Sequence, residues 1–437
     1  MKYCFSFLLL FFVTISSQSI YFPPVTGSQW ETVSPSTLNW DTTKIDSLYS
    51  FLQGTNTKAF LVLKDGKIVL EKYFGSFTRD SNWYWASAGK SLTAFLVGIA
   101  KQEGSLSLYD STSKYLGTGW TSLTPEQEDK IKVINQLTMT SGLDDGVPDP
   151  YCTLPSCLVY KSEPGNRWAY HNAPYTLLDG VMESAAGQNL NLFMQQRVKL
   201  VTGMSGVFLP SGYNNVYYST PRSMARFGLL MLNRGRWDAT PILTDTTYFR
   251  EMTNTSNTIN KSYGYLWWLN GKESFMLPQS QIVFPGMLSP EAPHSMISAL
   301  GKNGQILNIV PELNLVTVRM GDAPGSAIEV PTLYNNDIWK ILKQVIRYTP
   351  TSVKEPTSQT QSKGMVVYPN PATDRINFST PATVLEVDVY IYSVLGEKVA
   401  EGKNITSLDI SHLSPGVYQL ITKTQGEMSA TKFVKTR

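Results

Sequence analysis

The chain has 437 residues, with 37 basic and 34 acidic side chains and a formal net charge of only +3. This balance gives no electrostatic basis for nucleic-acid binding, whereas 42% apolar and 12% aromatic residues are enough for a large core. Three Cys and three His are too few for a cysteine-built scaffold or a multi-ligand zinc site, so no cofactor is expected. The length predicts two to three domains of roughly 100–200 residues.

The N-terminal segment has the form of a secretory signal peptide. Residues 1–19 begin with Met-Lys, continue as an apolar run from Tyr3 to Val13 and end in small polar residues. The run is much shorter than the ~20 residues that span a bilayer as a helix, which makes a retained anchor the weaker alternative. Cys4 would leave with the signal. No other stretch approaches membrane-spanning length, so no membrane-spanning segment is expected in the mature chain.

The first residues with a chemical signal follow a predicted hairpin. Two apolar runs, residues 59–63 and 68–74, flank an Asp-Gly turn. Apolar residues then recur at helical spacing over residues 92–100, so Ser87 is expected at the start of an amphipathic helix. Lys90 lies on the same helix face, where its amine could take the hydroxyl proton of Ser87. To do so Lys90 must be neutral, with its pKa lowered from ~10.4 toward ~7–8.

Short motifs of this kind are weak signals by themselves. Ser-x-x-Lys occurs twice more, at Ser111 to Lys114 and at Ser429 to Lys432. Tyr-x-Asn occurs four times, beginning at Tyr170, Tyr213, Tyr334 and Tyr368, and Lys-x-Gly occurs at Lys64 and Lys302. Spacing alone does not choose among these copies.

Cys152 and Cys157 enclose a short loop that contains proline. In an exported protein we expect a local disulfide between them, with two free thiols as the alternative. So small a ring would make the loop more rigid rather than stabilise the whole protein, and neither state makes the two residues catalytic.

Five stretches between residues 87 and 268 carry a resemblance to a known enzyme family. They are Ser-Ala-Gly-Lys at 87–90, Gln-Leu-Thr-Met-Thr-Ser-Gly-Leu at 136–143, Pro-Gly-Asn-Arg-Trp-Ala-Tyr-His-Asn at 164–172, Ser-Thr-Pro-Arg-Ser-Met-Ala-Arg-Phe-Gly at 219–228 and Tyr-Gly-Tyr-Leu-Trp-Trp at 263–268. In order and content they resemble class C β-lactamases and the esterases, amidases and peptidases related to them. The resemblance covers about residues 40–347, with Met139 where the family usually has His.

A further motif, Lys-Asn-Gly at residues 302–304, resembles the Lys/His-x-Gly of the strand beside the active site in this family. Asn-Gly between two apolar runs is also a hairpin signal, which leaves Lys302 as a solvated turn residue in the alternative interpretation. The Lys-Asp-Gly at residues 64–66 precedes Ser87 and is better explained as a turn.

The resemblance implies a catalytic role for three residues. Ser87 would be the nucleophile, and Lys90 would activate it. Tyr170 would be the partner base and the acid that protonates the leaving group. The sequence leaves open which of Lys90 and Tyr170 is the principal base, because they would titrate as a coupled pair.

The resemblance also implies a substrate-binding set. Asn172 would orient the substrate carbonyl or amide, and Lys302 would add positive charge beside the catalytic residues. Gly304 and Gln305 complete this set, and the backbone amides of Ser87 and of a residue near Gln305 would form the oxyanion hole.

Other chemistries and features have simpler interpretations. No Gly-x-Ser-x-Gly occurs, which disfavours an α/β-hydrolase. His171 is expected to point away from the substrate into a satisfied polar contact. The aromatic stretches 83–85 and 267–268 are expected mainly in the core, with a cleft lining as the alternative. Residues 336–346 predict a helix that covers the sheet.

The end of the chain reads as a linker and a small separate domain. Residues 348–365 are rich in Pro, Thr, Ser, Gln and Lys, and residues 366–437 show short alternating strands of a β-sandwich. The stretches Val-Tyr-Pro-Asn-Pro-Ala, Ile-Tyr-Ser-Val-Leu-Gly, Leu-Ser-Pro-Gly-Val-Tyr and the terminal Lys-Phe-Val-Lys resemble the C-terminal sorting domain of type IX secretion cargo. This implies passage through the periplasm and recognition by the secretion machinery. A carbohydrate-binding or cell-wall-binding module is the alternative.

Together these observations predict a signal peptide (1–19), a β-lactamase-like α/β (α+β) domain (20–347), a linker (348–365) and a sorting domain (366–437). The large domain is expected to be an antiparallel sheet flanked by helices, plus a helical lobe. We expect a secreted serine hydrolase that cleaves a small ester, amide or peptide. Within the family it resembles the esterase and 6-aminohexanoate-dimer hydrolase relatives more closely than true β-lactamases. The alternatives are a D,D-peptidase or β-lactamase that acts on peptidoglycan or lactams, and a surface binding protein that has lost turnover.

Overall fold

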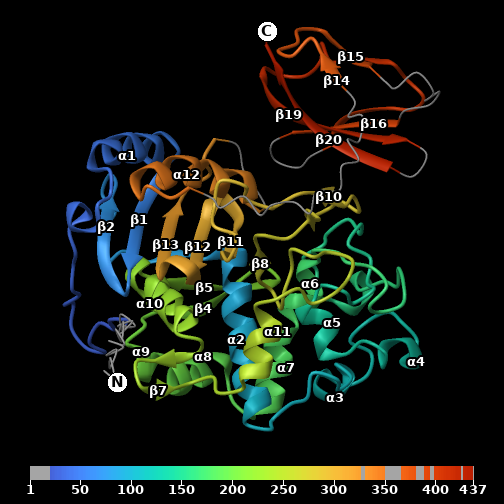
Figure 1. The fold of residues 1–437 in the computed structure, drawn as a ribbon. Helices are drawn as coiled ribbons and strands as arrows, with labels where there is room; N and C mark the ends of the chain where they lie inside the picture. The colour runs from blue at the N-terminus through green and yellow to red at the C-terminus, as the bar shows by residue number, and fades with distance from the viewer. Residues whose placement is uncertain are drawn as a thin grey trace, which may run out of the picture.

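The computed structural model describes residues 20–325, 330–349, 366–379, 388–393, 398–424 and 427–436 (Figure 1). The expected signal peptide and residues 350–365 of the expected linker lie outside the described residues. Within the described ranges, every helix is too short or too polar to cross a membrane.

A six-stranded antiparallel sheet forms the centre of the larger domain (Figure 1). Asp65 and Gly66 have φ values of +50° and +85°, the left-handed conformation that suits the predicted two-residue hairpin turn. In two central strands, Gln305–Val310 and Leu315–Gly321, every residue is buried, so the sheet must be covered on both faces. In spatial order the strands are β2 (Lys67–Tyr73), β1 (Thr57–Lys64), β13 (Leu315–Gly321), β12 (Gln305–Val310), β11 (Ile297–Gly301) and β8 (Trp268–Leu269).

Helices cover both faces of this sheet (Figure 1). Helices α1 (Ile45–Gly54) and α12 (Thr332–Val345) lie on one face, and α2 (Gly89–Gln102) and α10 (Pro221–Leu232) lie on the other. The predicted C-terminal helix is therefore confirmed as α12, which begins at Thr332 rather than at residue 336. Helix α10 packs closely on β13 because residue 228 is glycine: a Cβ there would lie 2.4 Å from Cγ1 of Val316.

The helix that follows Ser87 differs from its prediction in two respects. Ser87 lies in a 3-10 turn, Ala86–Ala88, and the α-helix α2 begins only at Gly89. The residues from Gly89 to Ala100 are all buried, so this helix has no solvent face. The physical reason is that the helix lies between the sheet and the helical part of the domain (Figure 1). Both sides of the helix are therefore covered, including the side that an amphipathic helix would expose to solvent.

A lobe of short helices lies beside α2, as the sequence predicted (Figure 1). It also carries a three-stranded antiparallel sheet in the order β3-β5-β4, which was not predicted because β3 has only two residues and shows no periodicity. These strands are β3 (Trp83–Tyr84), β5 (Asn214–Ser219) and β4 (Val207–Ser211). The remaining helices are α3 (Ser113–Leu116), α4 (Pro125–Glu128), α5 (Val133–Leu137), α6 (Asn172–Thr176), α7 (Leu178–Ala186), α8 (Leu190–Met194), α9 (Leu200–Thr202) and α11 (Thr246–Met252), and the remaining short strands are β6 (Arg236–Trp237), β7 (Thr240–Pro241), β9 (Ser274–Phe275) and β10 (Phe284–Pro285).

The C-terminal region is a small β-sandwich, which confirms the predicted strand-rich module. One sheet has the order β14-β15-β18 and the other β17-β16-β19-β20. Side chains from both sheets, among them Ile376, Val389 and Leu420, share one buried core. The strands are β14 (Val366–Tyr368), β15 (Arg375–Ser379), β16 (Asp388–Ser393), β17 (Lys398–Gly402), β18 (Ser407–Asp409), β19 (Gly416–Thr424) and β20 (Glu427–Lys435).

Candidate active site

Ser87 lies in a turn that contacts hold from two sides. The indole Nε1 of Trp85 donates a 2.8 Å hydrogen bond to Oγ of Ser219, which ties the turn to β5. At the end of β11, Gly301 comes so close that a Cβ there would lie 2.3 Å from the carbonyl oxygen of Trp85 and 3.1 Å from the amide nitrogen of Ser87. Ala86 has φ +47°, which is uncommon for a residue other than glycine. Glycine at position 301 thus lets the strand lie directly against the Ser87 turn.

Lys90 joins Ser87 to the Tyr-x-Asn segment. Its Nζ donates to Oγ of Ser87 at 3.0 Å and to Oδ1 of Asn172 at 2.7 Å. The side chain is 3% exposed, and its Nζ lies 5.2 Å from the ring centre of Tyr170 and 4.1 Å from that of Tyr175. A buried amine at hydrogen-bond distance from a serine hydroxyl is the arrangement in which the two exchange a proton.

Tyr170 is fixed by an aromatic cage. Its ring stacks on Trp268 at 5.6 Å between centres, Tyr263 meets it edge to face at 6.3 Å and Trp168 lies tilted against it at 6.4 Å. Trp268 is 2% exposed and Trp267 is 0% exposed, so the Trp-Trp pair belongs to the core. Helix α6 begins two residues later at Asn172. The cage therefore orients Tyr170 beside Lys90 while Asn172 enters the site at a helix start.

The Lys-Asn-Gly motif forms the tight turn between β11 and β12. Asn303 and Gly304 have φ values of +62° and +83°, so the hairpin interpretation is correct for the backbone. Lys302 nevertheless lines the same pocket as Ser87 and Lys90, so the turn and the site occupy the same place. The Gln305 side chain is fully buried and bonds the backbone of Gly321 on β13, which anchors the turn to the sheet.

Arg319 is a supporting residue that sequence reasoning missed. It is 1% exposed and donates to the carbonyl oxygens of Asn303 at 2.8 Å and Gly304 at 3.0 Å. Burial lowers the pKa of its guanidinium. A Cβ on Gly304 would lie 2.6 Å from Nη1 of Arg319, so this glycine makes room for the clamp. The available signal was a single charged residue inside the apolar strand 315–320.

A pocket of about 390 Å³ opens over these residues. Its lining contains two lysines, four tyrosines and three asparagines, and no carboxylate belongs to it among the described residues. The side chains and backbone that line it are Tyr84, Ala86, Ser87, Lys90, Tyr151, Asn172, Tyr175, Ser211, Asn214, Asn215, Val216, Tyr218 and Lys302. Such a volume suits a small organic substrate.

One acidic residue lies behind this lining. Burial raises the pKa of Asp179 to about 7, and a hydrogen bond from Asn215 partly offsets that rise. Oδ1 of Asp179 is buried without a hydrogen-bond partner. At neutral pH the Asp179 carboxyl is therefore only partly ionised. Its negative charge balances only part of the positive charge of the lysines that line the pocket.

None of the other motif copies that the structure describes makes the Lys90 contacts. Lys114 is on the surface and pairs with Asp110 at 2.8 Å. The hydroxyl of Tyr334 lies 2.7 Å from that of Thr55, away from the pocket. Tyr213 is 40% exposed, although Asn215 of the same copy lines the pocket. The copy at Ser429 lies in β20 of the sandwich. The fold therefore sets the Ser87, Lys90 and Asn172 group apart from the repeats that spacing alone could not exclude.

Two of the family-like stretches, residues 136–143 and residues 164–172, are joined by backbone hydrogen bonds. The amide of Ala169 donates to the carbonyl of Met139 at 2.9 Å, and the amide of Gly165 donates to the carbonyl of Thr140 at 2.8 Å. Met139 has φ +57° and is 4% exposed. The contact at position 139 uses the backbone and not the side chain of Met139.

His171 is buried and does not line the pocket. It is 2% exposed, and both ring nitrogens lack a hydrogen-bond partner among the described residues, so the expected satisfied polar contact is not observed. Burial lowers the pKa of the imidazole to about 4. The residue is therefore neutral at physiological pH.

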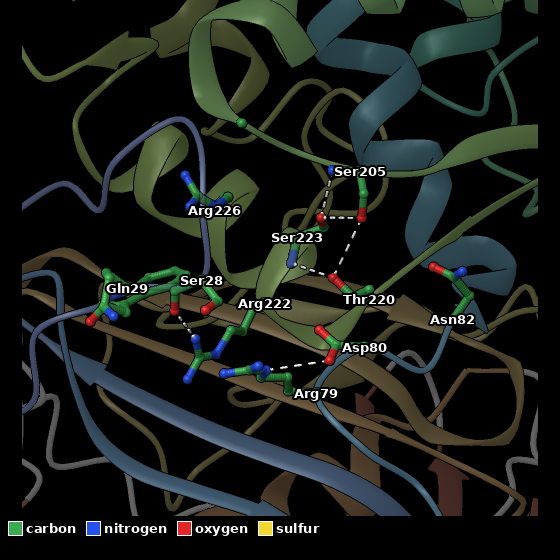
Figure 2. A pocket seen from close by; sticks show the side chains of 13 residues that line it. Ser28, Gln29, Arg79, Asp80, Asn82, Ser205, Thr220, Arg222, Ser223 and Arg226 are labelled. Carbon is green, nitrogen blue, oxygen red and sulfur yellow. Dashed lines mark hydrogen bonds and ion pairs between the residues drawn. The ribbon is translucent and has the colours of Figure 1, made fainter.

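A second cavity, of about 370 Å³, lies beside the start of α10 and holds none of the candidate residues (Figure 2). Its arginines are engaged in structural contacts. Arg222 binds both carboxylate oxygens of Glu71 at 2.7 Å and the carbonyl of Ser28, and Arg226 donates to the carbonyls of Thr202 and Pro24. The landmark 219–228 thus ties the N-terminal segment to the domain.

The comparisons with known proteins agree with this architecture. A model of the beta-lactamase family matches residues 51–329, more than half of the chain. The chain belongs to the beta-lactamase family. A second model, for the secretion system C-terminal sorting domain, matches residues 366–436 and indicates secretion by the type IX machinery to the cell surface or the medium.

Three similar proteins share little sequence with this beta-lactamase-family protein. A putative beta-lactamase from Bacteroides dorei is 19% identical with a TM-score of 0.56, over 71% of this chain and 100% of that one. A putative 6-aminohexanoate-dimer hydrolase from Bacillus anthracis is 16% identical with a TM-score of 0.53, over 75% and 91%. An uncharacterised protein of Alkalihalophilus pseudofirmus is 26% identical, over 61% of this chain and 83% of its own. The two structures share the serine-hydrolase fold of the family with this chain.

Proposed function

We propose that this protein is a secreted serine hydrolase that cleaves an ester or amide through an acyl-enzyme on Ser87. The observation that carries the proposal is the contact of Lys90 Nζ with both Ser87 Oγ and Asn172 Oδ1, in a pocket that Lys302 also lines. A nucleophile, a buried amine and a carbonyl-orienting amide in one small pocket are the parts that acyl transfer needs.

In the proposed acylation step, the Ser87 hydroxyl gives its proton to the Lys90 and Tyr170 pair as Oγ attacks the substrate carbonyl. Lys90 must be uncharged to take part. The backbone amides of Ser87 and of a residue near Gln305 stabilise the oxyanion. Tyr170 returns the proton to the leaving alcohol or amine, and the ester on Ser87 forms as that bond breaks.

In the second step a water molecule attacks the ester carbon of acylated Ser87. Lys90 and Tyr170, acting together as the base, take a proton from the water and return one to Oγ of Ser87. The carboxylic acid product is released and the free enzyme is restored. Asn172 and Lys302 hold the substrate, and Gly304 and Gln305 shape the turn that presents Lys302.

We also propose the export route that the two ends of the chain imply. Residues 1–19 act as a signal peptide for passage into the periplasm, and residues 348–365 link the hydrolase to the sorting domain. The family match of residues 366–436 supports the second half of this route.

The test of the proposed function compares the mature wild-type protein with Ser87→Ala on a short-chain p-nitrophenyl ester and on nitrocefin. We expect ester hydrolysis by the wild type and a loss of at least about 1,000-fold in Ser87→Ala. Turnover of nitrocefin but not of the ester would favour the lactam and peptidoglycan alternative. Equal rates in the two proteins, or no reaction with either substrate, would contradict the proposal and favour a binding protein.

A further inference from the structure

The loop between the landmark segments 136–143 and 164–172 contributes one side chain to the pocket. Tyr151 lines the same cavity of about 390 Å³ as Ser87 and Lys302. It is followed directly by Cys152, which is 3% exposed and bonded to Cys157. The disulfide expected from the sequence is therefore formed in the structure, and it lies next to the candidate site.

The backbone around Tyr151 is fixed at several points. The amide of Ala173, the residue after Asn172, donates to the carbonyl of Pro150 at 3.2 Å. The amide of Tyr151 donates to Oδ1 of Asp149 at 2.9 Å, and the amide of Cys152 donates to the carbonyl of Asp149 at 3.2 Å. Tyr151 thus stands between a hydrogen bond to the catalytic segment and a disulfide.

The same loop is tied to the Tyr-x-Asn segment by charge. Nη2 of Arg167 lies 2.6 Å from Oδ1 of Asp145, and both side chains are largely buried. This ion pair therefore joins the loop to the Tyr-x-Asn segment at a second point. A residue on this loop can keep a fixed position relative to Ser87.

Two more tyrosines line the same pocket from the small sheet. Tyr84 on β3 and Tyr218 on β5 have ring centres 6.4 Å apart, and the hydroxyl of Tyr84 accepts a 3.0 Å hydrogen bond from Nδ2 of Asn303. The pocket thus has aromatic side chains from the loop and from the sheet, with no carboxylate in its described lining. Aromatic faces favour flat, weakly polar groups, which gain from stacking or edge contacts.

We propose that Tyr151 is a specificity-determining residue that, with Tyr84 and Tyr218, binds an aromatic group attached to the scissile ester or amide. The proposal rests on the proposed hydrolase function and adds the substrate class. The Cys152–Cys157 disulfide supports this subsite from outside the pocket lining, because it limits the conformations of the loop and lowers the entropy lost when Tyr151 is ordered against the substrate.

The test measures kcat and KM by pH-stat titration for three esters that differ in where a ring is attached. Ethyl acetate has no ring, ethyl phenylacetate has one on the acyl side and benzyl acetate has one on the leaving side. We expect the wild type to prefer one of the two aromatic esters by at least about 10-fold in kcat/KM over ethyl acetate.

In Tyr151→Ala that preference falls by about 10-fold, mainly through a higher KM, and Tyr151→Phe retains it because the ring makes the contact. The double variant Cys152→Ser with Cys157→Ser shifts the preference in the same direction by a smaller factor. The matched control is Tyr160→Ala, since Tyr160 is on the same loop but 39% exposed and outside the pocket lining.

Circular dichroism and thermal melting show that each variant is folded before its kinetics are compared. No aromatic preference in the wild type, or an unchanged preference in folded Tyr151→Ala, overturns the inference. Reaction of wild-type Ser87 with a fluorophosphonate separates the two proposals. If an adduct forms, a missing or unchanged aromatic preference excludes only the role of Tyr151. If no adduct forms, the proposed hydrolase function itself is contradicted.

Discussion

At the scale of single residues, the site depends on one buried amine with two short contacts. The Nζ of Lys90 contacts both Ser87 and Asn172. The two aromatic rings near this amine are those of Tyr170 and Tyr175. Sequence reasoning named Ser87, Lys90 and Asn172, which the structure brings together, because the order of the family motifs singled them out. It could not show that Asn172 would bond Lys90 directly, because that contact joins residues far apart in the chain.

Replacing Lys90 by Met tests the amine without removing much volume. We expect kcat/KM for an ester to fall by about 100-fold or more, because the Ser87 hydroxyl loses its base. Lys114→Met, in the surface copy of the motif, is the matched control and should behave as the wild type does. Similar rates in the Lys90 and Lys114 variants would remove Lys90 from the mechanism.

The buried His171 predicts acid sensitivity. Its pKa is about 4 in the folded protein against 6.5 for the exposed side chain, so the unfolded state binds a proton first. Stability is therefore unaffected above about pH 6.5 and is lost as the pH falls toward 4, by about 3 kcal/mol in total from this group.

Urea unfolding of the wild type and of His171→Leu at pH 7 and at about pH 4.5 measures this loss. The wild type should lose about 2–3 kcal/mol more than the variant between the two values, since the other titrating groups are common to both. Equal losses would show that His171 does not titrate in this range.

At the scale of elements, close contact between a strand and a turn brings the two halves of the site together. The hairpins, α12 and the sandwich strands followed from periodicity and turn residues. The sheet formed by β3, β5 and β4 did not, because two-residue strands are defined by their partners and not by a local pattern. The clamp by Arg319 was missed for a similar reason: four of its five polar contacts are with residues 15 or more positions away in the chain.

The contact of β11 with the Ser87 turn predicts that Gly301→Ala is damaging. The added methyl would lie 2.3 Å from the Trp85 carbonyl, so the strand or the turn must move. We expect the rate of fluorophosphonate labelling to fall by at least about 10-fold, because displacement of catalytic groups is costly. Gly54→Ala on α1 meets open space and should label at the wild-type rate. Equal labelling of both variants would contradict this role of Gly301.

At the scale of the whole molecule, the chain joins a beta-lactamase-family hydrolase domain to a secretion sorting domain. Composition and motifs predicted both, because each carries its own local signals. The packing of Phe284 against Tyr392, with ring centres 5.8 Å apart, was not predictable, since it joins residues that are far apart in the chain. Leu277 and Ile421 extend the same contact.

Deletion of residues 366–437 tests the export route in cells. The truncated protein should accumulate in the periplasm, because the element that the type IX machinery recognises is missing. Fractionation and immunoblotting locate it, with full-length Ser87→Ala as the control that should reach the surface or the medium. Normal export of the truncated protein would refute the route.

The central claim is that Ser87 is the nucleophile, and covalent labelling tests it most directly. The mature protein is incubated with a fluorophosphonate, its intact mass is measured and the modified peptide is mapped. The account predicts a single adduct on the peptide that contains Ser87, and no adduct in Ser87→Ala. An unmodified wild type, or an equal adduct in Ser87→Ala, would contradict it.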